Sequence, residues 1–277
     1  MVVSGTDPRD GSPLQFSLNE NLKNALDEVK RVVGTDCQRG KDWDYISIVA
    51  GLPGTGKSNF AQNCARYCCS WFNEDYIAFT SDEFIELTNN CKENSAVILD
   101  ESFQSLNSKV GLTSEFLKII NHLQLIRQKR LYIFLCLPNF FDLSKSIAIY
   151  RSMHLFSCYS PKFGERGSFA AWGREEKKQL YILGQKFMNY NAVEPNFRGT
   201  FTKAHCINEE RYLEKKKQHL LSQSKSSEKH YKDTTTRDRL IVYLKEVEGW
   251  PIDKICGASG LSPKTIYNIC KRSEVKQ

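Results

Sequence analysis

The sequence predicts an α/β domain built on a parallel sheet, followed by a small all-α module. Three observations predict this arrangement. An apolar run, a glycine-rich loop and a helical pattern follow one another near residue 50, and further apolar runs alternate with amphipathic segments as far as residue 160. After a basic stretch, three short helical patterns complete the chain of 277 residues. We expect a flexible tail over 1–19, the α/β domain over 20–210, a basic helix and linker over 211–233, and the small module over 234–277.

The α/β domain is organised around residues 45–68. Residues 45–50 (YISIVA) are apolar and β-branched, which is typical of a buried strand. Residues 51–58 (GLPGTGKS) match the phosphate-binding motif G-x-x-x-x-G-K-[ST], and apolar residues then recur at helical spacing from Phe60 to Cys68. Strand, loop and helix in this order are the context that the motif requires. The candidate nucleotide-binding residues are Gly51, Leu52, Pro53, Gly54, Thr55, Gly56, Lys57, Ser58 and Asn59.

The residue types of this loop suit the recognition of phosphate. Glycines let the backbone curl so that several N–H groups point inward, and the helix that follows adds the positive end of its dipole. We expect Lys57 to reach the β- and γ-phosphates of ATP, and the Ser58 hydroxyl to bind Mg²⁺. The alternative is a glycine-rich turn that precedes Lys-Ser by chance. The flanking strand and helix favour nucleotide binding.

The other elements of the domain are predicted from the period of their apolar residues. An amphipathic helix over 21–33 precedes the loop, and a strand over 75–80 and a short helix over 82–87 follow it. Farther along the chain we expect a helix over 116–126, a strand over 131–137, a helix over 142–150 and a strand over 153–159.

Residues 95–101 (SAVILDE) resemble the Walker B motif, a buried strand of four apolar residues that ends in two acids. Ligands of doubly wound sheets bind at the carboxyl ends of the strands, where these acids lie. The resemblance implies that Asp100 holds Mg²⁺ through water and that Glu101 is the general base for the attacking water. The alternative is a surface Asp-Glu pair that closes a strand. The distance of the motif from the phosphate loop favours the catalytic interpretation.

Asn139 follows the strand over 131–137 and a proline. Related ATPases place a polar sensor here, between the γ-phosphate and water. An asparagine that merely opens a loop after Pro138 is the alternative, and the sequence leaves both open.

The end of the domain carries weaker signals. Residues 168–172 and 180–183 alternate or run apolar around a charged segment, which predicts an added β-hairpin. Residues 184–207 have the composition of irregular chain. Residues 211–217 begin a basic helix, and the Ser-rich stretch over 222–227 is expected to be a linker.

The C-terminal module is predicted to contain three helices. The first carries Leu240, Ile241, Leu244 and Val247, and Pro251 starts the second, which carries Ile252, Ile255 and Cys256. Ser262 is expected to cap the third, which carries Ile266, Ile269 and Cys270 on its inner face.

The second and third of these helices resemble the helix-turn-helix of resolvase-type and repressor-type DNA-binding domains. The small Cys256 allows close packing of the helices, and Gly260 supplies the sharp turn. A three-helix bundle used only for protein contacts is the alternative. The candidate DNA-binding residues on the third helix are Lys264, Thr265, Tyr267, Asn268 and Lys271.

Residues 41–160 resemble the division of P-loop ATPases that insert a strand between the phosphate loop and Walker B. This division includes AAA+ proteins, RecA-like enzymes and the FtsK/HerA pumps. The resemblance implies a P-loop NTPase core with strand order 5-1-4-3-2. A compact core with a hairpin favours the pumps, which include viral packaging ATPases and zonular-occludens-toxin-like proteins. Those pumps usually carry Gln where this chain has Asn139, which instead resembles the first sensor of AAA+ proteins.

Members of this division usually receive a catalytic arginine from a neighbouring subunit of a ring, which could be a hexamer. Arg127, Arg130 and Arg151 lie near the edges of predicted elements, where such a finger could project. The resemblance therefore implies a homo-oligomer.

Three functions remain in competition. The first is an oligomeric ATP-driven motor that translocates or packages DNA, as in viruses and mobile elements. The second is an AAA+ switch that loads or regulates a helicase, a transposase or another nucleic-acid enzyme. The third is a nucleotide-gated transcription regulator with little turnover. A small-molecule kinase is a weaker interpretation because Glu101 suits the activation of water.

Composition adds expectations about compartment and partners. The net charge of +7 hints at a polyanionic partner such as DNA if the excess is clustered. The ten cysteines form no C-x-x-C pair, which favours reduced thiols in an intracellular, cytoplasmic setting, or in the host cytoplasm if the chain is viral. We expect no membrane span, since no apolar run approaches about 18 residues, and no signal peptide, since residues 1–20 are polar.

Overall fold

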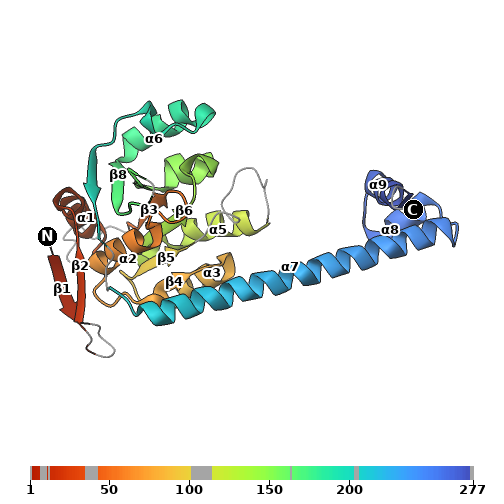
Figure 1. Cartoon of the computed structure of the whole chain (residues 1–277), viewed down its shortest axis with the longest axis horizontal. Coiled ribbons are helices and arrows are strands. Elements are labelled where there is room, and N and C mark those ends of the chain that lie inside the picture. The colour runs from red at the N-terminus through yellow and green to blue at the C-terminus, as the bar shows by residue number, and fades with distance from the viewer. Residues whose placement is uncertain are drawn as a thin grey trace. The chain divides into compact units, whose positions relative to one another are not determined.

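A computed structural model describes residues 2–6, 11, 13–34, 43–100, 114–162, 164–202 and 206–274 of the chain (Figure 1). The chain divides into two compact units, residues 1–213 and residues 214–277. The division falls inside one long helix, α7 (Glu209–Glu246), whose first turn belongs to the first unit.

The first unit is built on a seven-stranded sheet of order β4-β5-β6-β3-β7-β8-β9. Neighbouring strands from β4 to β7 are parallel, whereas β8 and β9 are antiparallel additions to one side. The strands are β3 (Tyr45–Ala50), β4 (Ile77–Ala78), β5 (Ala96–Leu99), β6 (Tyr132–Leu137), β7 (His154–Tyr159), β8 (Ser168–Trp172) and β9 (Phe197–Thr200).

The five parallel strands confirm the predicted order 5-1-4-3-2. Strand β3 is the first of them in the chain and pairs with β6 on one side and β7 on the other. All six of its residues are buried, which is why its sequence is a continuous apolar run rather than an alternating one. The carboxyl ends of β3, β5 and β6 therefore lie at the same edge of the sheet.

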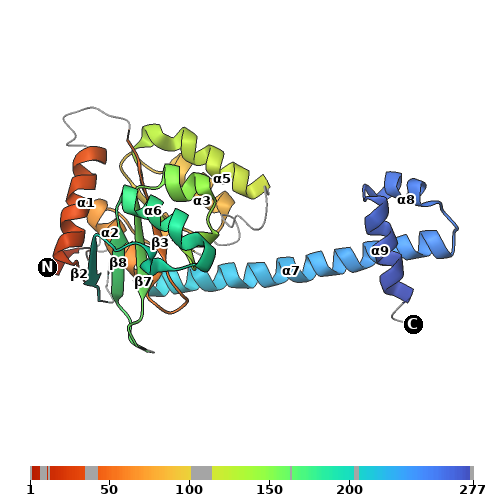
Figure 2. The ribbon, with the colours of Figure 1, turned by 90° about the horizontal axis from the view of Figure 1, so that it is seen from above.

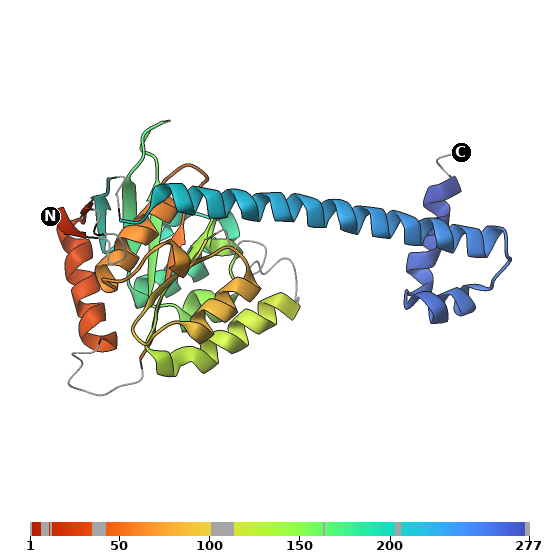
Figure 3. The same ribbon diagram turned by 90° about the horizontal axis from the view of Figure 1, so that it is seen from below.

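Helices cover both faces of this sheet, so the unit has three layers. Alternate strand residues face α1 (Glu20–Val33), α2 (Lys57–Cys68) and the first turn of α7 in one apolar cluster. The other strand residues face α3 (Ser81–Asn90), α5 (Ser114–Leu125) and α6 (Arg174–Gly184) in a second cluster. Figure 2 shows α1 beside α2, and Figure 3 shows α3 beside α5.

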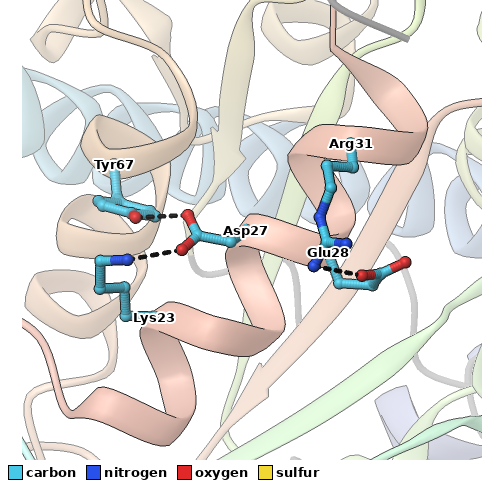
Figure 4. Close-up of polar contacts among 5 residues, drawn as sticks. All are labelled: Lys23, Asp27, Glu28, Arg31 and Tyr67. Carbon is cyan, nitrogen blue, oxygen red and sulfur yellow. Dashed lines mark hydrogen bonds and ion pairs between the residues drawn. The ribbon is translucent and has the colours of Figure 1, made fainter. Parts of the chain in front are cut away.

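Helix α1 confirms the helix predicted over 21–33, and polar contacts attach it to α2 (Figure 4). Tyr67 of α2 donates a hydrogen bond to Asp27 Oδ1 at 2.5 Å, and Lys23 Nζ lies 2.6 Å from Asp27 Oδ2. Burial raises the pKa of Asp27, but the hydrogen bonds from Lys23 and Tyr67 outweigh it and hold the pKa below its usual value. By contrast, the Arg31–Glu28 pair of the same helix is exposed.

The N-terminal residues differ from the expected flexible tail. Strands β1 (Val2–Thr6) and β2 (Pro13–Ser17) pair in an antiparallel two-stranded sheet. Phe16 and Leu18 are buried and belong to the same apolar cluster as α1. Their contribution to the core was not evident from the polar composition of the segment.

The predicted hairpin over 168–183 is wrong in its second half. Strand β8 is present, but its antiparallel partners are β7 and β9, and residues 174–184 form α6. Lys177, Leu180, Tyr181 and Gly184 are the buried residues of α6, at a spacing of three and four residues. The helical spacing of these buried residues therefore explains why the segment forms a helix and not a strand. The apolar run over 180–183 is only partly buried.

Two other predicted elements are replaced by shorter turns. The strand expected over 75–80 is a 3₁₀ turn over Glu74–Tyr76 followed by the two-residue strand β4. The helix expected over 142–150 is a 3₁₀ turn, η4 (Phe140–Asp142), and a π-helical segment, η5 (Ser146–Arg151). Further 3₁₀ turns are η3 (Ile126–Lys129), η6 (Gln185–Phe187) and η7 (Tyr190–Ala192).

The second unit contains the rest of α7, α8 (Ile252–Ser259) and α9 (Pro263–Glu274). Three features agree with the prediction. Ser262 Oγ accepts a hydrogen bond from Thr265 N at 3.2 Å, Gly260 ends α8 with φ of +68°, and Ile266, Ile269 and Cys270 are buried with Ile241 and Ile255. The stretch over 222–227 was expected to be a linker, but its backbone is helical and continuous with α7.

The described helices are too short or too polar to cross a membrane. None of the nine described cysteines forms a disulfide.

Candidate functional site

The loop over Gly51–Ser58 connects the end of β3 to the start of α2, as predicted. Its backbone requires glycine at three positions, because Gly51, Gly54 and Gly56 have φ of +151°, +85° and +92°. Space is also limiting at Gly51, where a Cβ atom would lie 2.3 Å from the carbonyl oxygen of Cys158 in β7. The sharp turn at the carboxyl end of the sheet is therefore a property of the glycines.

Helix α2 begins directly at this loop. Gly56 is its N-cap residue, and no side chain caps the helix. The first-turn N–H groups of a helix lack intrahelical acceptors and carry the positive end of the dipole. A phosphate in the loop would lie at this helix end, which suits an anion.

Lys57, the first residue of α2, folds back across the loop. Its Nζ donates a hydrogen bond to the carbonyl oxygen of Leu52 at 3.0 Å, and Thr55 Oγ1 donates to the same oxygen at 2.8 Å. The ammonium group is thus held above the loop, where it can meet the charge of a bound phosphate. Leu52 is exposed beside it.

Ser58 and Asp100 come together although 42 residues separate them in the chain. Ser58 Oγ donates a hydrogen bond to Asp100 Oδ1 at 3.0 Å. Asp100 follows β5 and is buried, and its backbone N–H donates to the carbonyl oxygen of Ala78 at 2.9 Å. The two residues predicted to hold a metal are therefore adjacent at one edge of the sheet.

This pair of oxygen donors fits Mg²⁺. Magnesium keeps several waters and is bound by one or two protein ligands together with substrate phosphates. Among the described residues, no group of three or more His, Cys, Asp and Glu side chains could hold a metal ion. The donor set therefore suits a cation that arrives with a phosphate ligand.

Tyr212, in the first turn of α7, is a residue of this site that the sequence analysis missed. Its hydroxyl donates a hydrogen bond to Asp100 Oδ2 at 2.8 Å. Burial, the negative charge of Asp100 and this hydrogen bond all hold the pKa of Tyr212 well above its usual value, so the phenol is a donor at neutral pH. Tyr212 and Asp100 are 112 positions apart in the chain, and no sequence pattern linked them.

Asn139 lies just after β6, at the same edge of the sheet as the loop. Its side-chain amide forms hydrogen bonds with two nearby residues. Nδ2 donates to Asp142 Oδ2 at 3.1 Å, and Oδ1 accepts from the Tyr190 hydroxyl at 3.2 Å. Asn139 also caps η4. The structure thus gives this residue the loop-opening role, and the sensor role stays a prediction.

The three candidate arginines lie at the opposite edge, next to the amino ends of the strands. Arg151 forms two hydrogen bonds with the carboxylate of Asp44, the residue before β3, and donates to the carbonyl oxygen of Leu123. Arg130 pairs with Glu93 at 2.5 Å, and Arg127 lies 5.8 Å from the centre of the Trp43 ring. Each of them therefore has a partner within its own chain.

Glu101, the predicted general base, lies outside the described residues. Its role as the base stays a prediction that rests on its position in the chain, directly after Asp100.

The predicted DNA-binding residues lie on α9. Lys264, Tyr267, Asn268 and Lys271 are exposed, whereas Thr265 is half-buried in the helix cap with Ser262. Lys245 Nζ lies 5.8 Å from the centre of the Tyr267 ring.

The net charge of the chain is concentrated in the second unit. Residues 214–277 hold fourteen Lys and Arg against eight Asp and Glu, which leaves +6 of the +7 there and +1 in residues 1–213. The excess of positive charge is thus clustered, as an interaction with a polyanion requires.

Comparisons with known proteins found no family model and no curated protein that matches this chain. Among solved structures, the chain is similar to the N-terminal domain of zonular occludens toxin from Neisseria meningitidis (15% identity, 58% of this chain and 95% of the other, TM-score 0.40). It is also similar to the genome packaging NTPase of Sulfolobus turreted icosahedral virus 2 in complex with AMP (11% identity, 50% and 95%, TM-score 0.35) and to the AAA domain of FIGL-1 in complex with ADP (16%, 70% and 82%, TM-score 0.39).

Proposed function

We propose that this protein is a Mg²⁺-dependent ATP hydrolase that acts on DNA through its second unit. The observation that carries the hydrolase is the contact between Ser58 and Asp100 directly beside the Gly51–Ser58 loop. A glycine-rich turn alone would need no carboxylate at this place. A loop that binds the Mg²⁺ salt of a nucleotide needs both a hydroxyl and a carboxylate there.

Each residue of the site has a distinct role in this proposal. The loop amides and Lys57 bind and orient the phosphates, and Ser58 and Asp100 would hold the metal ion. Bound Mg²⁺ would neutralise charge that develops on the phosphate oxygens. Glu101 would take a proton from the attacking water. The burial of Asp100 favours a metal site that is partly shielded from bulk water.

The second unit would supply the DNA contacts. Its clustered charge of +6 supports binding to the phosphate backbone, and the exposed face of α9 offers groups that can reach base edges. Lys264 and Lys271 suit phosphates, whereas Asn268 can make two hydrogen bonds with an adenine. We propose an oligomeric motor as the form in which the two units work together. A loader of another enzyme and a transcription regulator are the competing outcomes.

The test is the rate of ATP hydrolysis by the full chain with and without duplex DNA, combined with a sizing run in ATP. We expect hydrolysis that rises with DNA of any sequence and an oligomer that forms with the nucleotide. Stimulation that requires a partner protein would instead support a loader. A footprint on one DNA sequence with hardly any turnover would support a regulator.

Two variants of α9 test whether this helix contacts DNA. Asn268→Ala should reduce the preference among sequences, whereas Lys271→Ala should weaken binding to all duplexes and reduce the salt dependence by about one phosphate contact. If both variants bind DNA as the wild type does, α9 does not contact DNA.

A further inference from the structure

The contact between Tyr212 and Asp100 has a consequence for metal binding. We propose that Tyr212 is a positioning residue of the Mg²⁺ site: its hydroxyl fixes the rotation of the Asp100 carboxylate and thereby raises the affinity of the nucleotide site for the metal. This inference rests on the proposed function, because it assumes that Ser58 and Asp100 hold Mg²⁺ beside a bound nucleotide.

Two hydrogen-bond donors share the Asp100 carboxylate, one at each oxygen. Ser58 Oγ donates to Asp100 Oδ1 at 3.0 Å, and the Tyr212 hydroxyl donates to Oδ2 at 2.8 Å. Each oxygen of the buried carboxylate thus has a fixed hydrogen bond, and the plane of the group is defined from both sides. Rotation of the carboxylate would break both hydrogen bonds at a place where water cannot easily replace them.

Tyr212 is itself firmly held. Its ring is buried in the apolar cluster that includes Phe60 of α2, and the centre of the ring lies 6.1 Å from the centre of the Phe79 ring. In the neighbouring Arg211, Nη1 lies 3.7 Å from Oε1 of Glu74. A rigid donor of this kind can orient a carboxylate, whereas a surface tyrosine would move with it.

The same part of the chain also supports the phosphate loop. The Phe201 ring lies close to Gly56, where a Cβ atom would be 3.2 Å from two ring carbons, and its centre is 5.1 Å from that of Phe60. Phe201 and Tyr212 therefore contact the two halves of the site, the loop and the metal-binding carboxylate. Phe201 and the first turn of α7 thus complete the site.

A hydrogen bond to a metal-binding group from outside the metal's own ligands commonly accounts for 10- to 100-fold in metal affinity. Without the Tyr212 hydroxyl, Asp100 Oδ2 would lose a buried donor, and the carboxylate could turn away from the metal. The binding of the nucleotide without metal depends on the loop and Lys57, and should not change.

The experiment measures binding of the ATP analogue AMP-PNP to the full chain in EDTA and across a MgCl₂ titration. We expect Tyr212→Phe to need about 10-fold more Mg²⁺ for half-maximal tightening of AMP-PNP binding, with an unchanged dissociation constant in EDTA. Counting bound Mn²⁺ by electron paramagnetic resonance, in place of Mg²⁺, should give the same shift. If Tyr212 had only a structural role, Tyr212→Phe would weaken AMP-PNP binding equally in EDTA and in MgCl₂.

The matched control is Tyr67→Phe, which removes a tyrosine hydroxyl that donates to another carboxylate, Asp27, on the same face of the sheet. It should leave the Mg²⁺ titration unchanged. In an Asp100→Asn background, Tyr212→Phe should cause no further shift, because the group that it positions is gone.

The outcomes separate this inference from the proposed function. If the wild type binds AMP-PNP neither in EDTA nor in Mg²⁺, the proposed function fails. If the wild type binds with a clear Mg²⁺ dependence that Tyr212→Phe shares or strengthens, only the role of Tyr212 is overturned. Nucleotide binding without any Mg²⁺ dependence would contradict the metal site and the role of Tyr212 with it.

Discussion

The two edges of the parallel sheet use charged residues in opposite ways. At the carboxyl edge, Lys57 lies across a glycine loop, and Asp100 is held by the hydroxyls of Ser58 and Tyr212. At the amino edge, Arg151 binds the buried Asp44, and Lys177 is fully buried against Ser152. Charges at the amino edge hold elements together, and we propose that those at the carboxyl edge bind a ligand.

Lys177 illustrates the structural use of a charge. Its Nζ donates to Ser152 Oγ at 2.6 Å and to the carbonyl oxygen of Ser152, which attaches α6 to the turn before β7. Burial, and the nearby Arg174, lower the pKa of Lys177 to about 7. Burial lowers the pKa of the neighbouring His154 to about 4, with a smaller contribution from Lys177. Groups with strongly shifted pKa values therefore occur at the edge that has no phosphate loop, and a shifted pKa alone does not mark the active site.

The largest expected difference between the edges is in turnover. Glu101→Gln should reduce the rate of ATP hydrolysis by about 10²- to 10⁴-fold and leave ATP binding intact, because only the activation of water is lost. Single-turnover hydrolysis and equilibrium binding of ATP would measure the two effects separately. Hydrolysis at the wild-type rate would show that Glu101 is not the base.

The second prediction concerns the stability that the amino edge provides. Arg151→Ala should lower the free energy of unfolding by about 3 kcal/mol, because it leaves the buried Asp44 carboxylate without its cation. Nucleotide affinity should be unchanged at temperatures where the variant is folded. Urea denaturation and AMP-PNP titration are the measurements.

Arg31→Ala is the control for this variant, because the Arg31–Glu28 pair is exposed and should contribute less than about 1 kcal/mol. A loss of turnover in Arg151→Ala without a loss of stability would contradict the structural role. It would instead support the arginine finger that the sequence analysis expected.

The third prediction is a pH dependence at the amino edge. Between pH 7 and 10.5 the unfolded chain keeps a proton on Lys177 that the folded chain has released, so the free energy of unfolding rises with pH. The contribution is at most about 1.4 kcal/mol per pH unit. The free energy of unfolding of the wild type should therefore rise relative to that of Lys177→Met as the pH rises from 7 toward 10. Urea denaturation at several pH values measures this.

Lys178→Met is the matched control, since Lys178 is the exposed neighbour on α6. The difference between this variant and the wild type should not vary with pH. A constant difference for Lys177→Met as well would mean that Lys177 keeps its proton in the folded chain.

The sequence predicted the positions of the site residues better than it predicted their surroundings, and the roles of these residues stay predictions. The turn of the loop and the place of Asp100 at the end of β5 follow from local patterns, because glycine conformations and the ends of buried strands are encoded nearby. The arginines were predicted near element edges, but a residue that precedes a parallel strand, as Arg130 and Arg151 do, lies at the amino edge. Only the arrangement of the strands shows that this edge is opposite the loop.

Contacts between distant segments account for most of what the sequence missed. Lys177 sits in the charged segment that was expected between the two strands of a hairpin, and its burial depends on the position of Ser152. Tyr212 reaches Asp100 because the first turn of α7 lies at the carboxyl edge, which no local pattern indicates. The helical backbone over 222–227 was missed because Ser-rich composition favours a linker, whereas the neighbouring turns continue the helix.

We propose that the carboxyl edge binds a nucleotide and that the amino edge does not. The most direct test is the affinity of the full chain for Mg²⁺ and AMP-PNP, compared among the wild type, Lys57→Ala and Lys92→Ala, which removes an exposed lysine before β5 at the amino edge. Loss of the cation beside the phosphates should weaken binding about 100-fold in Lys57→Ala, whereas Lys92→Ala should bind like the wild type. Equal affinity in all three proteins, or no binding by the wild type, would contradict the claim.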